Sequence, residues 1–216
     1  MIKQGLLVAA LCSVIGSETA HAQFTVGAQY GLTFSHTDAT PDGTNSHYGV
    51  YGEWQSDFRF LKLGINWHTG TLSGGRKESP NDLYYNNKYT QGDLQIKLYP
   101  LRTFSDSSRV LYYLSGIYAG AGIGVLSSNT TIHKIPGLPF RYQDNYTGFL
   151  NGVIPISVGI DIPIRKAFQQ KGLSINFKYQ INYCMSDKID GYVPDLASNK
   201  SRDVYNMATF GLSYSF

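Results

Sequence analysis

The stretch Ala208-Thr-Phe-Gly-Leu-Ser-Tyr-Ser-Phe216 alternates between apolar residues and small or polar residues up to the last position of the chain. Its apolar residues share one face, while Thr209, Gly211, Ser213 and Ser215 share the other. A repeat of two over nine residues is typical of a β-strand with one apolar face. An exposed aromatic residue at a chain end is unusual in a soluble protein, because termini tend to fray into water. The stretch therefore predicts a terminal strand whose apolar face is covered.

The first residues have the features of a secretory signal peptide. Lys3 precedes the apolar run Leu6–Ile15, and Ala20-His-Ala22 follows as an A-x-A cleavage site. This run is too short to span a membrane as a helix. We therefore expect residues 1–22 to be removed and residues 23–216 to form one domain. Cys184 is then the one remaining cysteine, so no internal disulfide is expected.

The composition excludes some classes of protein. The formal net charge of +3 is too small to indicate a nucleic-acid partner. No segment of residues 23–216 approaches the roughly 18 consecutive apolar residues of a transmembrane helix. Aromatic residues nevertheless make up 14% of the chain, 17 of them Tyr, and the chain also contains 23 Gly. A transmembrane β-barrel fits this composition, because only alternate residues of its strands face lipid.

Eight segments of the chain alternate well enough to be strands, and each covers the roughly 9–11 residues that a tilted strand needs to cross a bilayer. They are Phe24–Ser35, His47–Gln55, Phe58–Thr69, Tyr89–Tyr99, Val110–Leu126, Phe149–Ile162, Leu173–Cys184 and Val204–Phe216. Short connections (56–57, 100–109 and 163–172) alternate with long polar ones (36–46, 70–88, 127–148 and 185–203). The pattern predicts an all-β, eight-stranded antiparallel up-and-down transmembrane β-barrel with short periplasmic turns and four longer extracellular loops.

The polar face of these strands carries the ionisable residues. A lysine near mid-membrane would cost about 2–4 kcal/mol if it faced lipid, so we expect this face to line the interior. A soluble eight-stranded barrel would show the reverse pattern, with its apolar face inward. Eight strands leave an interior that side chains just fill. We therefore predict a plug of interior ion pairs, and no open pore, from Glu53, Lys62, Asp93, Lys97, Asp161 and Lys178.

Two further patterns belong to the strands. Outward aromatic residues near strand ends predict girdles at the two membrane interfaces: Tyr48, Trp54, Trp67, Tyr113, Tyr183 and Tyr214. The inward glycines Gly120, Gly122 and Gly124 are expected to leave room for large neighbours such as Tyr51 or Tyr99.

The signal peptide, the eight alternating segments, Ala119-Gly-Ala-Gly-Ile-Gly124 and the terminal Leu212-Ser-Tyr-Ser-Phe216 together resemble the small bacterial outer-membrane β-barrel family of the OmpA/OmpX type. The resemblance covers residues 23–216 and implies a place in the bacterial outer membrane. It also implies that the barrel-assembly machinery reads Phe216 as an assembly signal. Members of this family are adhesins, envelope-stability proteins or narrow channels, so the resemblance leaves the role open among these.

Some eight-stranded barrels are lipid A acyltransferases or deacylases, which need a histidine near a serine or a carboxylate. The candidates are His36 with Asp38, His47, His68 and His133, together with Ser35 and Ser127 near the outer rim. None of them lies in a recognisable catalytic motif, and no two histidines have a ligand-like spacing. The sequence therefore predicts no catalytic residue, no cofactor and no metal site, and keeps a lipid A-modifying enzyme as the alternative.

The long connections favour an interaction role. The segments 82–89 and 140–146 mix Tyr, Asn and Arg or Lys, which are residue types used at binding surfaces. Arg76, Lys77, Lys134 and Arg141 are candidates for contact with the phosphates of outer-leaflet lipopolysaccharide. The expected partners are outer-membrane lipid and lipopolysaccharide, the assembly machinery, and an extracellular ligand or surface.

Overall fold

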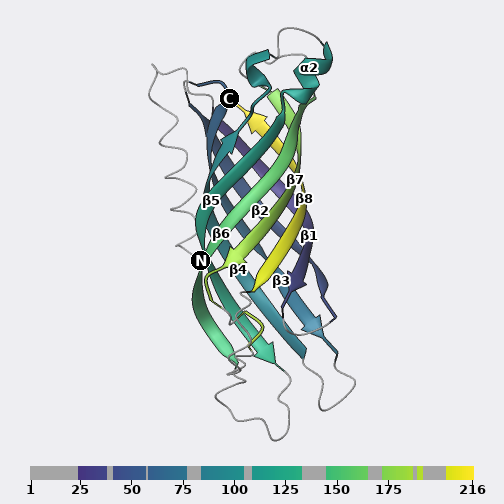
Figure 1. Ribbon diagram of the computed structural model, residues 1–216, viewed down its shortest axis with the longest axis vertical. Coiled ribbons are helices and arrows are strands. Elements are labelled where there is room, and N and C mark those ends of the chain that lie inside the picture. Colours follow the sequence, from purple (N-terminus) through teal and green to yellow (C-terminus); the bar gives the residue numbers. More distant parts are fainter. Residues whose placement is uncertain are drawn as a thin grey trace, which may run out of the picture.

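The strands close into a barrel in which each one pairs with its neighbour in the chain. The computed structural model describes residues 24–37, 41–56, 58–76, 84–104, 109–132, 145–164, 172–186, 189–191 and 203–216. Within these ranges eight antiparallel strands form one closed sheet (Figure 1). They are β1 (Phe24–His36), β2 (Thr44–Gln55), β3 (Leu61–Gly75), β4 (Tyr84–Leu98), β5 (Ile117–Ile132), β6 (Tyr146–Pro163), β7 (Gly172–Cys184) and β8 (Val204–Ser215). The predicted fold class is confirmed, while the predicted signal peptide, residues 1–22, lies outside the described residues.

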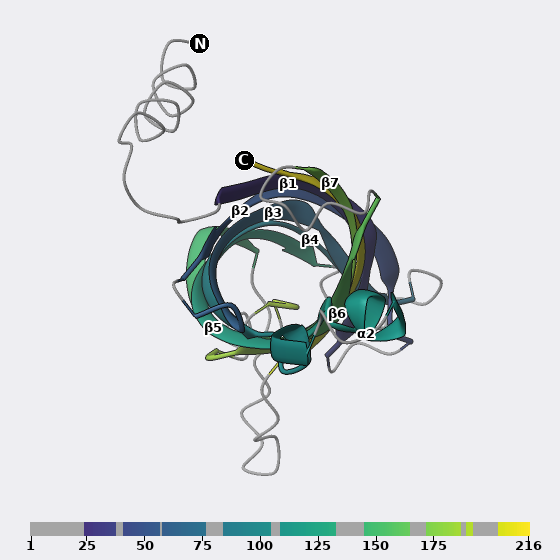
Figure 2. The same ribbon diagram turned by 90° about the horizontal axis from the view of Figure 1, so that it is seen from above.

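The barrel closes through the pairing of its first and last strands. The ladder between β1 and β8 runs from Thr25 opposite Ser215 to His36 opposite Val204. The backbone N–H of Phe216 extends it by donating to the carbonyl of Phe24 over 2.9 Å. Seen along its axis, the sheet is a ring without a free edge (Figure 2). Every strand thus has a partner on both sides, as a membrane barrel requires.

The two faces of the sheet differ in the way that the alternation predicts. Outward side chains are apolar and exposed, as at Ile65, Leu94 and Phe210, whereas inward polar side chains such as Gln91, Gln180 and Asn182 are fully buried. This is the reverse of a soluble barrel, and it suits a wall surrounded by lipid. No helix among the described residues is long and apolar enough to cross a membrane.

Several strands continue beyond the expected bounds. β3 ends at Gly75 and pairs with β4 up to Tyr84, and β5 runs to Ile132 opposite Tyr85. Outward residues of these extensions are polar or small, so their alternation is not hydrophobic although the backbone ladder continues. One consequence corrects a prediction: Trp67 lies in the middle of β3, and not near a strand end.

The connection from β4 to β5 contains helix where strand was expected. Residues Arg102–Phe104 form the 3-10 helix η2, and Arg109–Leu114 form the short helix α2. The segment from Val110 to Gly116 was therefore wrongly predicted as strand, and Tyr113 is an exposed helix residue, not part of a strand girdle. The Gly116 carbonyl accepts the Asp161 N–H over 2.9 Å, which ties the end of this connection to β6. Figure 1 shows α2 at the end of the barrel where β8 finishes.

Candidate functional site

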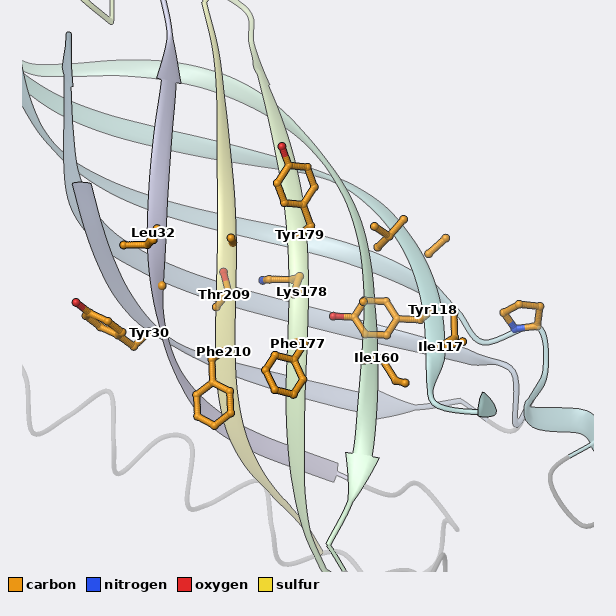
Figure 3. A pocket seen from close by; sticks show the side chains of 16 residues that line it. Tyr30, Leu32, Ile117, Tyr118, Ile160, Phe177, Lys178, Tyr179, Thr209 and Phe210 are labelled. Atoms are coloured by element: carbon orange, nitrogen blue, oxygen red, sulfur yellow. The ribbon is translucent and has the colours of Figure 1, made fainter. Parts of the chain in front are cut away.

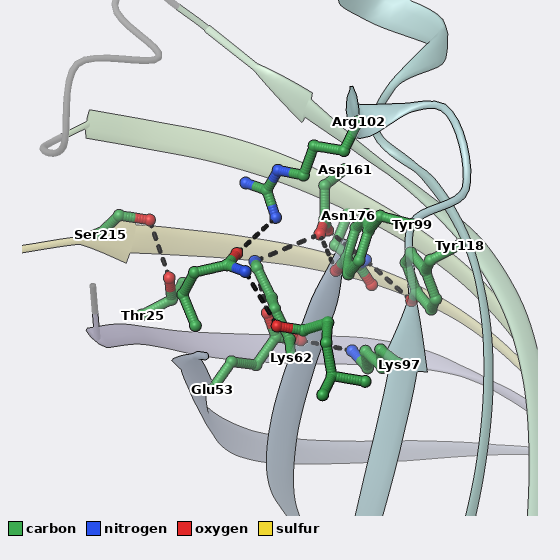
Figure 4. Close-up of polar contacts among 12 residues, drawn as sticks. Thr25, Glu53, Lys62, Lys97, Tyr99, Arg102, Tyr118, Asp161, Asn176 and Ser215 are labelled. Carbon is green, nitrogen blue, oxygen red and sulfur yellow. Dashed lines mark hydrogen bonds and ion pairs between the residues drawn. The ribbon is translucent and has the colours of Figure 1, made fainter. Parts of the chain in front are cut away.

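The candidate site is the barrel interior. An ion cluster occupies it near the end of the barrel where β1 begins and β8 finishes. Glu53 on β2 accepts hydrogen bonds from two ammonium groups, that of Lys62 at 2.9 Å and that of Lys97. Lys62 also lies 3.7 Å from the Asp161 carboxylate on β6 (Figure 4). Strands β2, β3, β4 and β6 thus contribute one charge each, and the two positive charges balance the two negative ones. The structure brings together these four of the six predicted residues.

Aromatic and amide groups enclose this cluster. The Tyr99 hydroxyl donates to Asp161 Oδ2 over 2.6 Å, and Asn176 Nδ2 donates to Asp161 Oδ1 over 2.7 Å. The ammonium of Lys97 lies 4.6 Å from the centre of the Tyr118 ring, a cation–π distance. Tyr99 follows the last residue of β4, and its burial, together with the Asp161 and Glu53 carboxylates, raises the pKa of its hydroxyl well above the usual value. The hydroxyl therefore stays protonated and remains a donor.

An arginine covers the cluster from the β4–β5 connection. Arg102 lies with its guanidinium 4.9 Å from the centre of the Tyr99 ring and donates to Gln55 Oε1 over 2.7 Å (Figure 4). Gln55 in turn donates to the carbonyls of Phe58 and Leu61 in the β2–β3 turn. Arg102 and Gln55 thereby link the β4–β5 connection to the β2–β3 turn at the barrel end beside the ion cluster.

Asp93 and Lys178 do not join this cluster. The Asp93 carboxylate accepts three amide hydrogen bonds, from Asn66 at 2.7 Å and from Gln91 and Gln95 at 2.8 Å each. Lys178 is buried on β7, and no ion pair within the described ranges joins it to Asp93. The amides satisfy the carboxylate in the manner that a buried charge requires.

Hydrogen bonds cross the lumen next to the ion cluster, on its side away from the end where β1 begins. Gln95 on β4 donates to Gln180 on β7 over 3.0 Å, and Gln91 donates to Asn182 over 3.1 Å. The Tyr205 hydroxyl on β8 donates to Gln91 Oε1. Because β4 is separated from β7 and β8 along the wall, these contacts join opposite sides of the barrel. The polar side chains therefore meet in the middle of the lumen at this level.

Inward glycines provide the room that this packing needs. A Cβ on Gly27 would lie 2.4 Å from the Tyr51 ring, and one on Gly159 would lie 2.5 Å from the Tyr118 hydroxyl. A Cβ on Gly124 would lie 2.6 Å from Cβ of Asp93. Inward glycines were expected to make room for large neighbours, but the partners differ: the glycine beside Tyr51 is Gly27, on an adjacent strand, and not one of β5.

At the opposite end of the barrel, part of the β7–β8 connection lies inside the mouth. Ile189 is 1% exposed and belongs to an apolar cluster with Leu126, Val153, Cys184 and Met207. Its carbonyl accepts from Asn87 Nδ2 at 2.8 Å and from Thr130 Oγ1 at 3.0 Å, and its N–H donates to Asp203 Oδ2 at 2.8 Å. We call residues 189–191 the mouth plug. Sequence reasoning missed it, because the connection also contains other apolar residues, such as Val193 and Leu196, and nothing local marks Ile189 as buried.

The conformation of Gly191 fits this return of the chain. Its φ of 82° lies in the left-handed region, which favours glycine. Gly191 and the neighbouring Asp190 are both buried.

Of the histidines that were candidates for catalysis, His47 and His68 lie inside the barrel, and His36 lies exposed at the last position of β1. His68 has no solvent exposure; its Nδ1 lies 3.3 Å from Gln29 Nε2, and its Nε2 lies 3.8 Å from Asp93, beyond hydrogen-bond distance. His47 lies between two hydroxyls, Thr33 at 3.0 Å and Thr209 at 3.1 Å. His36 contacts Asp42 at 2.7 Å. His133 and Asp38 lie outside the described residues, and within the described ranges no group of three His, Cys, Asp or Glu side chains could hold a metal ion.

Two further predicted residues that the structure describes, Arg76 and Phe216, lie at opposite ends of the barrel. Arg76 follows β3 directly and is exposed, while Lys77, Lys134 and Arg141 fall outside the described residues. Phe216 follows β8, is exposed outward, and makes an edge-to-face contact with Tyr214 at a centroid distance of 5.0 Å.

No protein-family model matches the sequence, and no curated protein sequence matches it. Among solved structures, the chain is similar to Ail, the attachment invasion locus protein of Yersinia pestis, in complex with the heparin analogue sucrose octasulfate. The TM-score is 0.50 at 11% identity, over 91% of this chain and 100% of Ail. The outer membrane protein OprG from Pseudomonas aeruginosa gives a TM-score of 0.41 at 10% identity, over 93% of this chain and 98% of OprG.

The likeness to Ail shows that the chain has the fold of a small outer-membrane β-barrel. With its apolar outer wall and polar interior, this fold places the protein in the bacterial outer membrane, as the sequence predicts. In such barrels the end with the short turns, where β1 begins and β8 ends, faces the periplasm.

Proposed function

We propose that this outer-membrane β-barrel is a closed scaffold that acts at the cell surface through its extracellular loops, in an adhesive or envelope-interaction role. The observation that carries the proposal is the filled lumen. Side chains of β4 form hydrogen bonds to β7 and β8 across the lumen. The ion cluster of Glu53, Lys62, Lys97 and Asp161 lies on the periplasmic side of these bonds, and the mouth plug lies on their extracellular side. A barrel filled in this way leaves its loops as the part that meets external partners.

The histidine contacts favour this role over the catalytic alternative. A lipid A-modifying enzyme needs a histidine that reaches both a nucleophile or carboxylate and the lipid. His68 has no solvent exposure, and its hydrogen-bond partner is an amide, not a serine. His36 is exposed, but its two ring nitrogens contact Asp42 and Asn206, and neither partner is a serine nucleophile. Mass spectrometry of lipid A from cells with and without the gene tests this alternative. We expect identical spectra, and a change in acylation would replace the proposal with an enzyme function.

The loops offer polyanion chemistry. Arg76 is exposed at the extracellular end of β3, and Lys77, Lys134 and Arg141 belong to the same set of basic loop residues. Lysine and arginine in such positions bind phosphate or sulfate groups through charge-assisted hydrogen bonds. The solved structure of Ail contains a sulfated heparin analogue, which makes sucrose octasulfate a suitable probe of this chemistry.

The direct test compares cells that display the wild-type barrel with cells that display Arg76→Glu, Lys77→Glu, Lys134→Glu and Arg141→Glu combined. We expect the combined variant to lose adhesion to immobilised heparin, and its purified form to retain less lipopolysaccharide. Arg59→Glu, in the periplasmic β2–β3 turn, is the matched control and should behave as the wild type. Unchanged adhesion and unchanged lipopolysaccharide retention in the combined variant would rule out the polyanion role.

A further inference from the structure

The outer wall of the barrel carries an apolar groove of about 970 Å³ across β5, β6, β7, β8 and β1 (Figure 3). Its lining is almost entirely apolar and includes Tyr30, Phe177 and Phe210 on the wall and Pro100 from the β4–β5 connection. The groove therefore extends from the lipid-facing wall to the periplasmic connection of the barrel.

The strand register explains the shape of the groove. Ile117, Ile160, Phe177, Phe210 and Tyr30 pair directly with one another across five strands and form one continuous outward row. The next outward row consists of Ala119, Val158, Tyr179, Ala208 and Leu32, and the surface is lower at its two alanines, Ala119 on β5 and Ala208 on β8. The large side chains of the first row therefore stand beside two low positions of the surface, one at Ala119 and one at Ala208.

The row has the length and slope of one half of the membrane. Five strands with spacings of about 4.8 Å cover roughly 19 Å. Because barrel strands tilt by about 35–45°, a row perpendicular to them rises by roughly 11–14 Å along the membrane normal. This is close to half of the ~25 Å apolar band of such barrels.

The ends of the row fix which half of the membrane it crosses. Ile117 is the first residue of β5, at the periplasmic end, and Tyr30 is the middle residue of β1. The groove thus leads from the periplasmic interface up to the middle of the membrane. Its lower end lies beside Pro100 and near α2, whose residues Val110, Tyr113 and Leu114 are exposed apolar side chains.

We propose that this groove binds one acyl chain of a phospholipid from the periplasmic leaflet, with the headgroup at the β4–β5 connection. A single hydrocarbon chain suits a slanted groove between outward rows only two residues apart along each strand, roughly 7 Å. A second barrel presents a convex wall, which would not enter such a groove. Lipopolysaccharide of the outer leaflet would have to enter from the extracellular end, whereas the groove begins at the periplasmic end.

The test is native mass spectrometry of the full barrel after purification in mild detergent and incubation with dipalmitoyl phosphatidylethanolamine. We expect one retained phospholipid for the wild type and loss of that phospholipid for Ala119→Phe and Ala208→Phe, which fill the two low positions of the groove. Ala121→Phe is the matched control, because Ala121 is an exposed outward residue of the same strand outside the groove. The milder Ala119→Leu should weaken retention and gives the answer if the phenylalanine variants fail to fold.

Three results would overturn the proposal. Equal retention by all variants would mean that the lipid is ordinary annular lipid. Retention of lipopolysaccharide in place of phospholipid would assign the groove to the other leaflet. A lipid-free dimer that Ala208→Phe dissociates would assign it to a second copy of the chain.

Discussion

Asn87 Nδ2 donates to the Ile189 carbonyl over 2.8 Å, so a side chain of the barrel wall holds the mouth plug in place. Thr130 Oγ1 donates to the same carbonyl from the adjacent strand β5. The plug is therefore anchored to two strands on the opposite side of the barrel from the connection that carries it, and it covers the apolar cluster that contains Cys184.

Removal of both anchors should expose Cys184. In the variant Asn87→Ala with Thr130→Val, the Ile189 carbonyl loses both side-chain donors, each worth about 0.5–1.5 kcal/mol. Local opening of the plug should then be favoured by about tenfold or more. The measurement is the rate of Cys184 modification by a maleimide, since Cys184 is the one thiol of residues 23–216.

A matched control is available for this experiment. Asn45 on β2 also makes a side-chain hydrogen bond near the mouth, to Ser73 Oγ over 2.9 Å, and this bond does not involve the mouth plug. Asn45→Ala should leave the labelling rate of Cys184 unchanged. Equal labelling rates in the wild type and the double variant would show that the plug does not guard the cluster.

The substitution Glu53→Gln should destabilise the barrel. It leaves the ammonium groups of Lys62 and Lys97 buried without their shared carboxylate, and breaking a buried pair typically costs about 3–5 kcal/mol. The measurement is the urea midpoint of unfolding in detergent or vesicles. Addition of Lys97→Met should recover part of the loss, because the number of unpaired charges falls. The exposed Lys88→Met is the control, and an unchanged midpoint for Glu53→Gln would mean that the cluster does not stabilise the fold.

The substitution Gly27→Ala should also be destabilising, for a steric reason. The added methyl group would lie 2.4 Å from the Tyr51 ring, and overpacking of this kind typically costs about 1–3 kcal/mol. At Gly64 the nearest atom would be 3.8 Å away, an ordinary contact, so Gly64→Ala is the matched control. Tyr51→Leu should rescue Gly27→Ala in the same unfolding assay, and failure of this rescue would contradict the steric explanation.

Deletion of Phe216 should impair insertion into the outer membrane more than it impairs the stability of barrels that do insert. Phe216 adds one backbone hydrogen bond and one aromatic contact to the end of β8, a small share of the β1–β8 ladder. The measurements are the amount of folded barrel in outer-membrane fractions and the unfolding midpoint of that fraction. Phe216→Tyr, which keeps an aromatic ring, is the control. Normal insertion of the deletion variant would show that Phe216 is not an assembly signal.

Much of the wall could be predicted from alternation alone, because facing lipid or lumen is a property of each residue within its own strand. Phe24–His36 and Gly172–Cys184 follow their expected bounds within one residue. The extensions of β3 and β5 beyond Thr69 and Leu126 were missed, since their outward residues no longer face lipid. The helix α2 was missed because its short run of apolar residues does not distinguish helix from strand.

The interior partners could not be predicted, because they depend on the stagger between strands. Opposite charges on the polar face indicate that pairing is favourable but not which groups meet. Lys178 lies opposite Thr209 and Gly159, and Asp93 is surrounded by amides of its own and adjacent strands. The mouth plug depends on the tertiary position of Asn87 and Thr130, which no local pattern of the β7–β8 connection contains.

The central claim is that the barrel interior is closed, and single-channel recording of the purified protein in a planar bilayer tests it most directly. We predict no steady conductance above the background of the bilayer, both for the wild type and for the variant with Asn87→Ala and Thr130→Val. The variant should stay closed because the hydrogen bonds of Gln91 and Gln95 still cross the lumen on the periplasmic side of the mouth plug. A steady, reproducible conductance of the wild-type barrel would contradict the account and assign the protein to the channels.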